Sequence, residues 1–337
     1  MTEMTVLNGV AIEELLTIPM AVEAVEQAYL EKSKGDAALW PMVFHEFDPG
    51  HADLDIKSGD LGGLGFYGLK VVSWFGANPG KGLPALYGTS LLFDLATGAP
   101  RALLNAGPIT DFRTGGAGAI GAKYLAQPDA ETLLMAGTGA LAPYLIAATL
   151  YLLPQIKTVY VTNPHHPECS AAACEAITPQ VEKLLSGCGG CHAAIAAAPD
   201  LEKAVRHSDV ILTATPAREP FIKAEWVQPG THISCVGADM SGKQEVDSAL
   251  FASAKVFGDD TAQCLSVGEC EVPYKAGVFS GHICEIGGVI SGAEAGRTDA
   301  SDITIFDSTG IALQDIATAA ALLQAAQETG KGQTVTL

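Results

Sequence analysis

The first residues with a clear chemical use are two glycines that follow a short apolar run. Residues 131–136 read as a buried strand, Gly137 and Gly139 form a turn, and a long apolar helix begins near Ala142. Glycines let the backbone approach a dinucleotide pyrophosphate, and a helix N-terminus offers it free N–H groups. The G-x-G-x-x-A spacing predicts an NAD or NADP site, and a glycine turn without a ligand is the alternative. The residues expected to hold the pyrophosphate are Gly137, Thr138, Gly139, Ala140 and Leu141.

The residue after the next strand bears on which dinucleotide fits. The expected strand 158–162 is followed by Asn163, at a position where an acidic residue would bind the ribose hydroxyls and favour NAD. Asn163 is neutral and tolerates a 2′-phosphate, but no arginine follows it. His165 and His166 are either phosphate partners or ordinary loop residues. The sequence therefore leans slightly to NADP.

Two cations fall in apolar surroundings, where a buried charge is costly without an anion. Lys70 lies in the strand-like run 68–75, and Arg113 is expected at the start of a helix. A substrate carboxylate or a cofactor phosphate would compensate them, and arginine can bind such groups through two parallel hydrogen bonds. An internal salt bridge explains the same residues, and this alternative stays open.

The acidic candidate is Asp239, in the loop 236–245. The loop follows the apolar run 233–236, and open α/β sheets bind ligands beyond the carboxyl ends of their strands. A carboxylate there can exchange a proton with an amine or imine nitrogen beside a nicotinamide. Capping of a following helix is the alternative role.

A cysteine motif offers other chemistry. Cys188-Gly-Gly-Cys191-His192 matches the c-type haem attachment pattern, which requires export, yet no export signal is visible. A zinc site would add Cys169 and Cys174, but a helical stretch separates the two pairs by roughly 20 Å. We therefore expect no metal and interpret all eight cysteines as reduced thiols.

Composition narrows the classes of partner. The 337 residues carry 38 acidic and 19 basic side chains, a formal charge of -19, which argues against nucleic acid and anionic membranes. No basic, apolar signal segment is visible, so we expect a cytoplasmic protein. The uncharged stretch 132–156 is long enough to span a bilayer, but its glycines and Pro143 favour a strand followed by a buried helix.

Two regions must position these candidates. Up to about residue 110, a helix at 12–34 and a mostly antiparallel sheet are expected, with strands at 44–47, 68–75, 86–94 and 101–105. Beyond it, strands alternate with helices, which predicts a doubly wound parallel sheet. These strands are expected at 158–162, 193–197, 210–214, 233–236 and 255–257, and a last helix at 311–327 returns to the first region.

Seven blocks of residues occur in one order and carry a resemblance to a known family. They are Gly68-Leu-Lys70-Val-Val, Gly82-Leu-Pro84, Asp94 with Thr97-Gly98, Ile109-Thr110 with Arg113-Thr114, Gly137-Thr-Gly139, Val236-Gly-Ala-Asp239 with Gly242-Lys-Gln-Glu245, and Gly296-Arg-Thr298 with Phe306-Asp-Ser-Thr-Gly310. Over about residues 10–325, the sequence resembles the ornithine cyclodeaminase/μ-crystallin family.

The resemblance implies a homodimer in which a Rossmann domain, residues 113–307, is inserted in a substrate-binding and dimerisation domain, residues 1–112 with 308–337. Lys70 and Arg113 would hold the substrate carboxylate, and Asp239, with Lys70, would be catalytic. The cofactor would also contact Arg113, Thr114, Thr213, Ala214, Thr215, Val236, Gly237, Asp239, Ser308, Thr309 and Gly310.

The sequence departs from the family pattern at two places. Met42 stands where many members have an arginine, and Lys57-Ser58 stands where many have Met-Pro. Our hypothesis is that Lys57 replaces the missing positive charge from a neighbouring strand and binds substrate.

Three functions are compatible with these residues. The first is an NAD(P)-dependent amino-acid dehydrogenase or imine/ketimine reductase, with hydride transfer at Cα, and the loop 237–245 resembles the alanine dehydrogenase branch. The second is an ornithine cyclodeaminase-type ammonia lyase that recycles its NAD. The third is a non-catalytic, μ-crystallin-like binding protein. The side chain of the substrate is not predicted.

Overall fold

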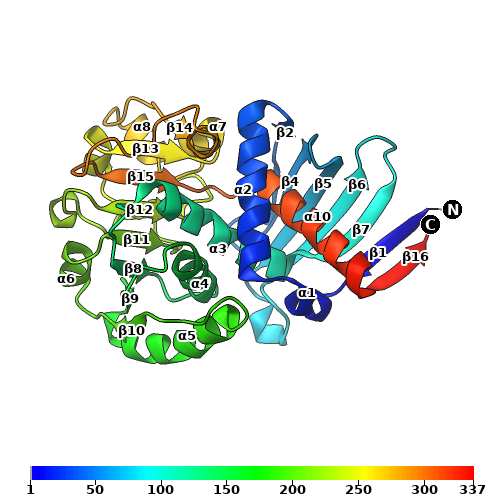
Figure 1. The fold of residues 1–337 in the computed structure, drawn as a ribbon, viewed down its shortest axis with the longest axis horizontal. Helices are drawn as coiled ribbons and strands as arrows, with labels where there is room; N and C mark the ends of the chain where they lie inside the picture. Colours follow the sequence, from blue (N-terminus) through cyan, green and yellow to red (C-terminus); the bar gives the residue numbers. More distant parts are fainter. Residues whose placement is uncertain (1) are drawn as a thin grey trace. The chain divides into compact units, whose positions relative to one another are not determined.

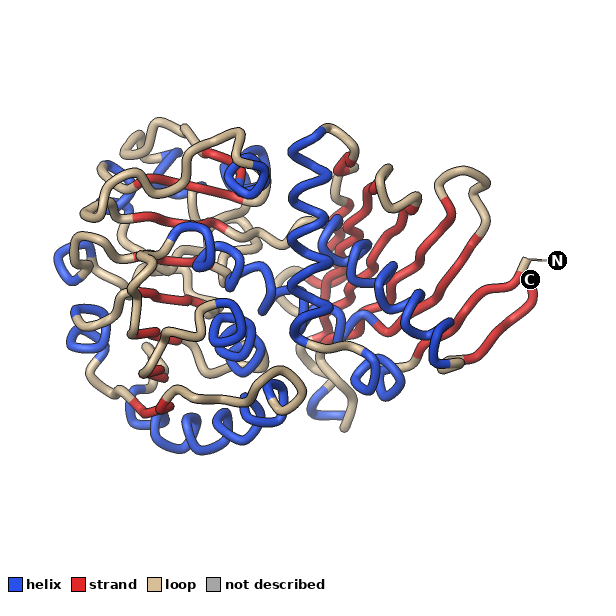
Figure 2. Tube along the Cα trace, viewed as in Figure 1, coloured by secondary structure: helices blue, strands red, loops and turns tan. Residues whose placement is uncertain are grey.

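The computed structural model describes residues 2–337, and these divide into two compact units. The first unit contains the chain up to Arg113 together with Ile311–Leu337, and the second contains Thr114–Gly310. Figure 1 labels the helices and strands of each unit, and Figure 2 separates them by type.

The first unit is one eight-stranded sheet with helices on one face, in strand order β16-β1-β7-β6-β5-β4-β2, with β3 added beside β4. Only the β1–β7 pair in this sheet is parallel. Its elements are β1 (Glu3–Leu7), α1 (Gly9–Leu15), α2 (Ile18–Lys34), β2 (Ala37–Leu39), β3 (Val43–Asp48), β4 (Ala52–Leu61), β5 (Phe66–Phe75), η1 (Pro79–Lys81), β6 (Leu86–Asp94), β7 (Pro100–Asn105), the first part of α3 (Ala106–Leu125), α10 (Ala312–Thr329) and β16 (Gln333–Thr336).

A pair of glycines lets α10 lie close to the middle of this sheet. Gly59 of β4 and Gly68 of β5 are cross-strand partners. A Cβ at Gly59 would lie 3.0 Å from Leu313, and one at Gly68 would lie 3.4 Å from Ile316. Figure 1 shows α10 crossing this face with α2 beside it. Gly59 therefore leaves room for Leu313 above the sheet, and Gly68 allows Ile316 to lie in van der Waals contact with the strand.

The second unit is an eight-stranded, wholly parallel sheet in the order β10-β9-β8-β11-β12-β15-β13-β14. Strands are added outward from β8 in both directions, so the predicted doubly wound, Rossmann-type sheet is confirmed. Its elements are β8 (Thr132–Ala136), α4 (Ala142–Leu152), β9 (Thr158–Thr162), η2 (Pro167–Cys169), α5 (Ser170–Leu185), β10 (Ala194–Ala197), α6 (Leu201–Arg206), β11 (Val210–Thr213), η3 (Ala224–Trp226), β12 (His232–Cys235), η4 (Ser248–Ala252), β13 (Lys255–Gly258), α7 (Thr261–Ser266), α8 (Glu271–Lys275), β14 (Cys284–Glu285), α9 (Ile286–Ser291) and β15 (Thr304–Asp307).

Several expected element boundaries are wrong. The helix predicted at 12–34 is two helices, because the chain is extended at Leu16 and Thr17, and Thr17 caps α2 by accepting the Met20 N–H. Helix α3 begins at Ala106, so Arg113 lies within the helix and not at its start. Its proline, Pro108, falls in the first turn, where the missing N–H costs little. Strands β1, β2, β4, β14, β15 and β16 were not predicted.

The long uncharged stretch forms two buried elements. Residues 132–156 contain strand β8 and helix α4, joined by the glycine turn. Within residues 2–337, no helix is long and apolar enough to cross a membrane.

Candidate active site

Lys70 is placed by its position in β5. It lies two residues beyond Gly68, so its side chain points to the same face of the sheet, toward α10. Lys57 of β4 is its direct cross-strand neighbour. The Lys70 side chain is only 3% exposed, and its Nζ lies 3.4 Å from Thr110 Oγ1. The sheet therefore brings two lysines side by side beneath one helix.

Arg113 approaches the same point from α3, and Asp315 of α10 meets both cations. Asp315 Oδ1 accepts a hydrogen bond from Lys70 Nζ at 2.9 Å and another from Arg113 Nε at 3.2 Å. The three side chains are between 2% and 7% exposed. The internal salt bridge, which was the alternative explanation for Lys70 and Arg113 in the sequence, is therefore present. It is unusual because two buried cations share one carboxylate oxygen.

The electrostatics of the cluster are unbalanced. Burial lowers the pKa of Lys70 to about 8; Asp315 opposes this effect, whereas Arg113 and Lys57 add to it. Burial raises the pKa of Asp315, but the two bonded cations outweigh it and the net change is downward. Asp111 also acts on Arg113, and burial raises its pKa to about 6. The hydrogen-bonded contact of two cations with one carboxylate therefore keeps one excess positive charge at neutral pH, which ionised Asp111 partly offsets at Arg113.

Two further residues brace Arg113. Its Nη1 donates to Gln314 Oε1 at 2.9 Å, and Gln314 Nε2 donates to the hydroxyl of Tyr29 at 2.7 Å. Both bracing residues are buried. The guanidinium is therefore held at both Nε and Nη1, and Nη2 takes part in neither of these hydrogen bonds.

The predicted glycine turn has the shape that a pyrophosphate requires. Gly137 has a φ of +126°, and a Cβ there would lie 2.5 Å from the Ala214 carbonyl oxygen, so only glycine fits. A Cβ at Gly139 would meet no protein atom within 4 Å, and it would instead fill the cradle in front of α4. No side chain caps the N-terminus of α4. These features fit a dinucleotide held by Gly137, Thr138, Gly139, Ala140 and Leu141.

Asn163 ties the β9 loop to this turn. Its Oδ1 accepts the backbone N–H groups of His165 and His166 at 3.1 and 2.9 Å, and its Nδ2 donates to Thr138 Oγ1 at 3.1 Å. His166 pairs with Glu168 at 3.4 Å. The loop thus presents a carboxylate, and no arginine, next to the position expected for the adenosine ribose.

Glu245 joins the ends of two neighbouring strands. Thr213 donates to its Oε2 at 2.6 Å, and the N–H and hydroxyl of Thr215 both donate to Oε1 at 2.7 Å. Gly237 N–H donates to Oε2 at 2.9 Å. The loops 213–215 and 236–239, both predicted to contact the cofactor, therefore share one buried carboxylate.

The turn 308–310 has a similar support in Asp259. Thr309 Oγ1 donates to Asp259 Oδ1 at 2.8 Å, and Gly310 N–H donates to Oδ2 at 2.9 Å. The buried hydroxyl of Ser308 finds no hydrogen-bond partner within residues 2–337. An unsatisfied buried hydroxyl of this kind fits a ligand oxygen at the turn.

Asp239 lies in the exposed part of its loop. Its side chain is 53% exposed and pairs with Lys243 of the same loop. It lies just past β12, where the sequence placed it, and its carboxylate is accessible to a ligand. Thr114, by contrast, is buried within α3.

Sequence reasoning missed the residues that organise each part. Asp315, Gln314 and Tyr29 lie outside every motif except the general pattern of a helix. One signal was available, since an Asp inside the apolar run Ala312–Leu323 is unusual for a buried helix face. Glu245 stood within a recognised block, but its role as an acceptor for two strand ends was not deduced.

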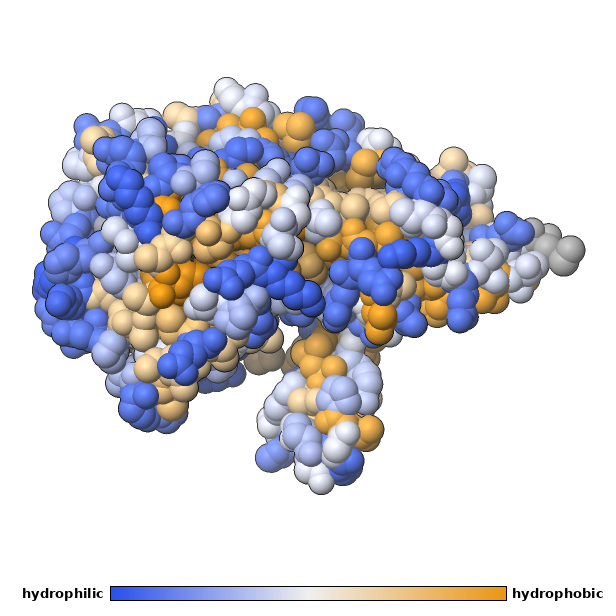
Figure 3. Space-filling view, turned by 60° about the horizontal axis from the view of Figure 1, so that its bottom comes forward, coloured by the Kyte–Doolittle hydropathy of each residue, from blue (hydrophilic) through white to orange (hydrophobic). Residues whose placement is uncertain are grey.

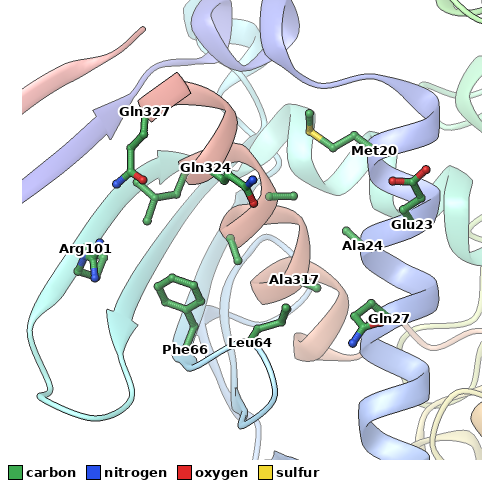
Figure 4. Close-up of a pocket in the computed structure, with 13 residues that line it drawn as sticks. Met20, Glu23, Ala24, Gln27, Leu64, Phe66, Arg101, Ala317, Gln324 and Gln327 are labelled. Carbon is green, nitrogen blue, oxygen red and sulfur yellow. The ribbon is translucent and has the colours of Figure 1, made fainter. Parts of the chain in front are cut away.

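Other hollows and motifs do not share this chemistry. A hollow of about 420 Å³ lies between α2 and α10, with Glu23, Gln27 and small side chains around it (Figure 4). Its lining cation, Arg101, is already paired with Asp94 at 3.2 Å. This hollow therefore offers no excess positive charge for an anion.

The cysteines form no cross-links. All eight are free thiols, and burial raises the pKa of both Cys188 and Cys191. Within the described chain, no group of three or more His, Cys, Asp or Glu side chains is arranged to hold a metal ion.

Comparison with known proteins places the chain in a family. The family model described as "Ornithine cyclodeaminase/mu-crystallin family" matches residues 2–330. The chain belongs to this family, and the resemblance seen in the sequence is confirmed.

Three solved structures are similar over nearly the whole chain. An archaeal alanine dehydrogenase dimer with bound NAD is 35% identical, with a TM-score of 0.86 and 99% of each chain covered. The iminosuccinate reductase of Paracoccus denitrificans in complex with NAD+ is 31% identical, with a TM-score of 0.89 and coverage of 99% and 100%. The Δ1-pyrroline-2-carboxylate reductase of Thermococcus litoralis, in complex with NADH and L-proline, is 31% identical, with a TM-score of 0.87 and coverage of 98% and 100%.

Proposed function

We propose that this protein is an NAD-dependent oxidoreductase that acts at the Cα of a 2-amino or 2-imino acid. The observation that carries the proposal is the buried contact in which Lys70 and Arg113 share one oxygen of Asp315. Buried ion pairs contribute little net stability, so surplus buried charge favours a functional reason for its retention. An acid substrate would supply the second anion, and the three similar enzymes are named for reactions of amino or imino acids.

Each part of the site receives a role in this proposal. Lys70 and Arg113 bind the substrate carboxylate, with Lys57 adding positive charge from the adjacent strand. The glycine turn and the N-terminus of α4 hold the pyrophosphate, while loops 213–215, 236–239 and 308–310 border the rest of the cofactor. When bound, the nicotinamide gives or takes the hydride at Cα. Asp239 moves the proton at the substrate nitrogen, a task that its exposed carboxylate allows.

NAD is the proposed cofactor, in preference to NADP. The Asn163 amide donates to Thr138 and accepts hydrogen bonds from the backbone of the following loop, so it is not available to bind a 2′-phosphate. Glu168 would also repel that phosphate. The slight lean to NADP rested on the neutrality of Asn163 alone. A kcat/KM that is higher with NADPH than with NADH would overturn this choice.

A substrate panel tests the proposed activity. The protein is incubated with NADH and either 2-oxo acids plus ammonia or methylamine, or cyclic imines such as 1-pyrroline-2-carboxylate, while NADH absorbance is followed. Consumption of NADH is expected. Ammonia release from ornithine without net NADH change would instead support the cyclodeaminase alternative, and binding without turnover would support a non-catalytic binding protein.

A single variant tests the role of Asp239. Asp239→Asn keeps the size of the side chain and removes its capacity to exchange a proton, so turnover should be abolished. The affinity for NADH, measured by fluorescence, should stay within about twofold, since the variant loses no carboxylate that supports the cofactor loops. Wild-type turnover in this variant would remove Asp239 from the mechanism.

We also propose that a domain of residues 1–112 with 308–337 binds substrate and forms a homodimer, and that residues 113–307 bind the dinucleotide. Figure 3 shows apolar side chains on the surface, and many of the large exposed ones belong to the strands of the first unit or to the loops that flank these strands. They are Trp40, Met42, Val43, Phe44, Phe47, Phe75, Leu83, Leu86 and Tyr87. Light scattering should give twice the chain mass, and Phe44→Glu should weaken the dimer.

A further inference from the structure

Asp315 occupies an unusual place beneath the two cations. It comes from α10, whereas Lys70 comes from β5 and Arg113 from α3, and all three side chains are buried. Packing of α10 on the Gly59–Gly68 pair fixes the position of Asp315 relative to the strands. The carboxylate is therefore held by the backbone of the fold and does not depend on the cations for its location.

The contact with Asp315 orients both cations. Lys70 has a long, flexible side chain, and without an anion it would be repelled by the guanidinium of Arg113. Arg113 is bound at Nε by Asp315 Oδ1 and at Nη1 by Gln314 Oε1. Nη2 takes part in neither of these bonds, so it is the nitrogen that these two residues leave for another acceptor.

The second oxygen of Asp315 indicates that the ion pair is not optimised for stability. Oδ2 is buried and has no hydrogen-bond partner within the described residues. An ion pair retained for stability would be expected to satisfy both oxygens, since an unpaired buried acceptor is costly. Both cations instead converge on Oδ1, which brings their charges together at one point.

We propose that Asp315 is a positioning residue, which holds Lys70 and Arg113 together as a single receptor for the substrate carboxylate. The proposal rests on the proposed function, because it takes these two cations as the carboxylate-binding groups. Asp315 acts through them and does not contact the substrate.

The charged groups around Lys70 predict in which direction its pKa changes when the charge of Asp315 is removed. Asp315 faces it from α10, Arg113 from α3 and Lys57 from β4, while uncharged Ser90 is its neighbour on β6. Burial, Arg113 and Lys57 all lower the pKa of Lys70, and Asp315 is the group that raises it. Removal of the Asp315 charge should therefore move the Lys70 pKa down from about 8.

The decisive variant is Asp315→Asn in the full chain. Lysine Nζ is labelled with ¹⁵N, the Lys70 signal is assigned by its loss in Lys70→Arg, and its pKa is measured by NMR titration. Loss of a carboxylate in direct contact should lower this pKa by at least about one unit. The alkaline limb of the kcat/KM profile should move in the same direction, and KM for the acid substrate at neutral pH should rise about tenfold or more, with NADH affinity unchanged.

The outcomes separate this proposal from the proposed function. An unchanged Lys70 pKa in a folded Asp315→Asn protein overturns the positioning role. A lowered pKa with an unchanged KM supports the effect of Asp315 on Lys70 but overturns the assignment of Lys70 to the substrate. Should Asp315→Asn not fold, Asp315→Glu keeps the charge and displaces the cations by one methylene. It is expected to leave the Lys70 pKa near its wild-type value and to raise KM, and a wild-type KM would overturn the proposal.

Discussion

The two units solve the problem of buried charge in opposite ways. In the first unit, two cations share one carboxylate oxygen, and positive charge is left over. In the second unit, the carboxylates of Glu245 and Asp259 are surrounded by hydroxyl and backbone N–H donors that belong to loops. The cations of the first unit can bind a further anion. The carboxylates of Glu245 and Asp259 already accept hydrogen bonds from the protein, so their role is to hold the neighbouring loops in place.

The pKa values of the buried carboxylates in the second unit strengthen this contrast between the two units. Burial raises the pKa of Glu245, and the four donors that it accepts oppose this shift. Glu269 accepts two backbone N–H groups with one oxygen, while its other oxygen has no partner in the described chain. Burial, and then the charge of Glu245, raise the pKa of Glu269 well above its ordinary value. In the second unit, burial and the repulsion between these two carboxylates therefore favour the binding of a proton, whereas the first unit keeps its excess charge.

Among the variants that test this comparison between the two units, Lys70→Met should give the largest effect. Lys70→Met removes one cation and leaves Asp315 paired with Arg113, so the fold should tolerate it. Loss of a contact between charged groups costs about 3 kcal/mol, which corresponds to roughly a 100-fold fall in kcat/KM for the acid substrate. Steady-state kinetics and thermal unfolding measure the two effects separately.

Arg101→Met is the matched control for this prediction. Arg101 belongs to the same unit, but it is half exposed and already has Asp94 as its own partner. Its removal should leave kcat/KM near the wild-type value. An equal loss of activity in both variants would mean that the surplus charge at Lys70 has no special role.

Glu245→Gln should affect the cofactor and not the acid substrate. A glutamine can still accept from Thr215, but its amide group faces the N–H of Gly237 and cannot accept that bond. One lost hydrogen bond to a charged acceptor costs about 1.5 kcal/mol, so Kd for NADH should rise about tenfold. Glu271→Gln, which changes the acceptor of Gly242 N–H at the tip of the same loop, should have a smaller effect. If Glu245→Gln and Glu271→Gln weakened NADH binding equally, the carboxylate at the strand ends would be no more important for the cofactor than the one at the loop tip.

The same contrast explains what the sequence could predict. Gly137 and Gly139 were found because a turn between a strand and a helix is a local pattern, and the parallel sheet followed from the alternation of elements. Lys70 and Arg113 were found because charges in apolar runs are conspicuous. Asp315 was not, because it lies 245 residues from Lys70, and only the packing of α10 on the sheet brings the two together.

Asp307 should make the stability of the protein depend on pH. Burial raises its pKa from 3.8 to about 7, so its stabilising contribution is complete below pH 3.8 and is lost as pH rises through about 7. Asp307→Asn cannot ionise and should remove this loss, which is on the order of a few kcal/mol. Urea unfolding at pH 5 and pH 8 should show the variant gaining stability relative to wild type at the higher pH. A stability difference that does not change between the two pH values would contradict the assignment.

Lys57 should give the smallest effect and is the sharpest test of the charge surplus. It is the cross-strand neighbour of Lys70, and its charge lowers the pKa of both Lys70 and Asp315. If it contributes charge to the receptor at a distance, Lys57→Met should raise KM about threefold to tenfold, and the effect should shrink as salt screens the interaction. If Lys57 instead replaces the arginine missing at Met42 by direct contact, the loss should approach that of Lys70→Met and resist salt. An unaltered KM would contradict both accounts and leave the carboxylate to Lys70 and Arg113 alone.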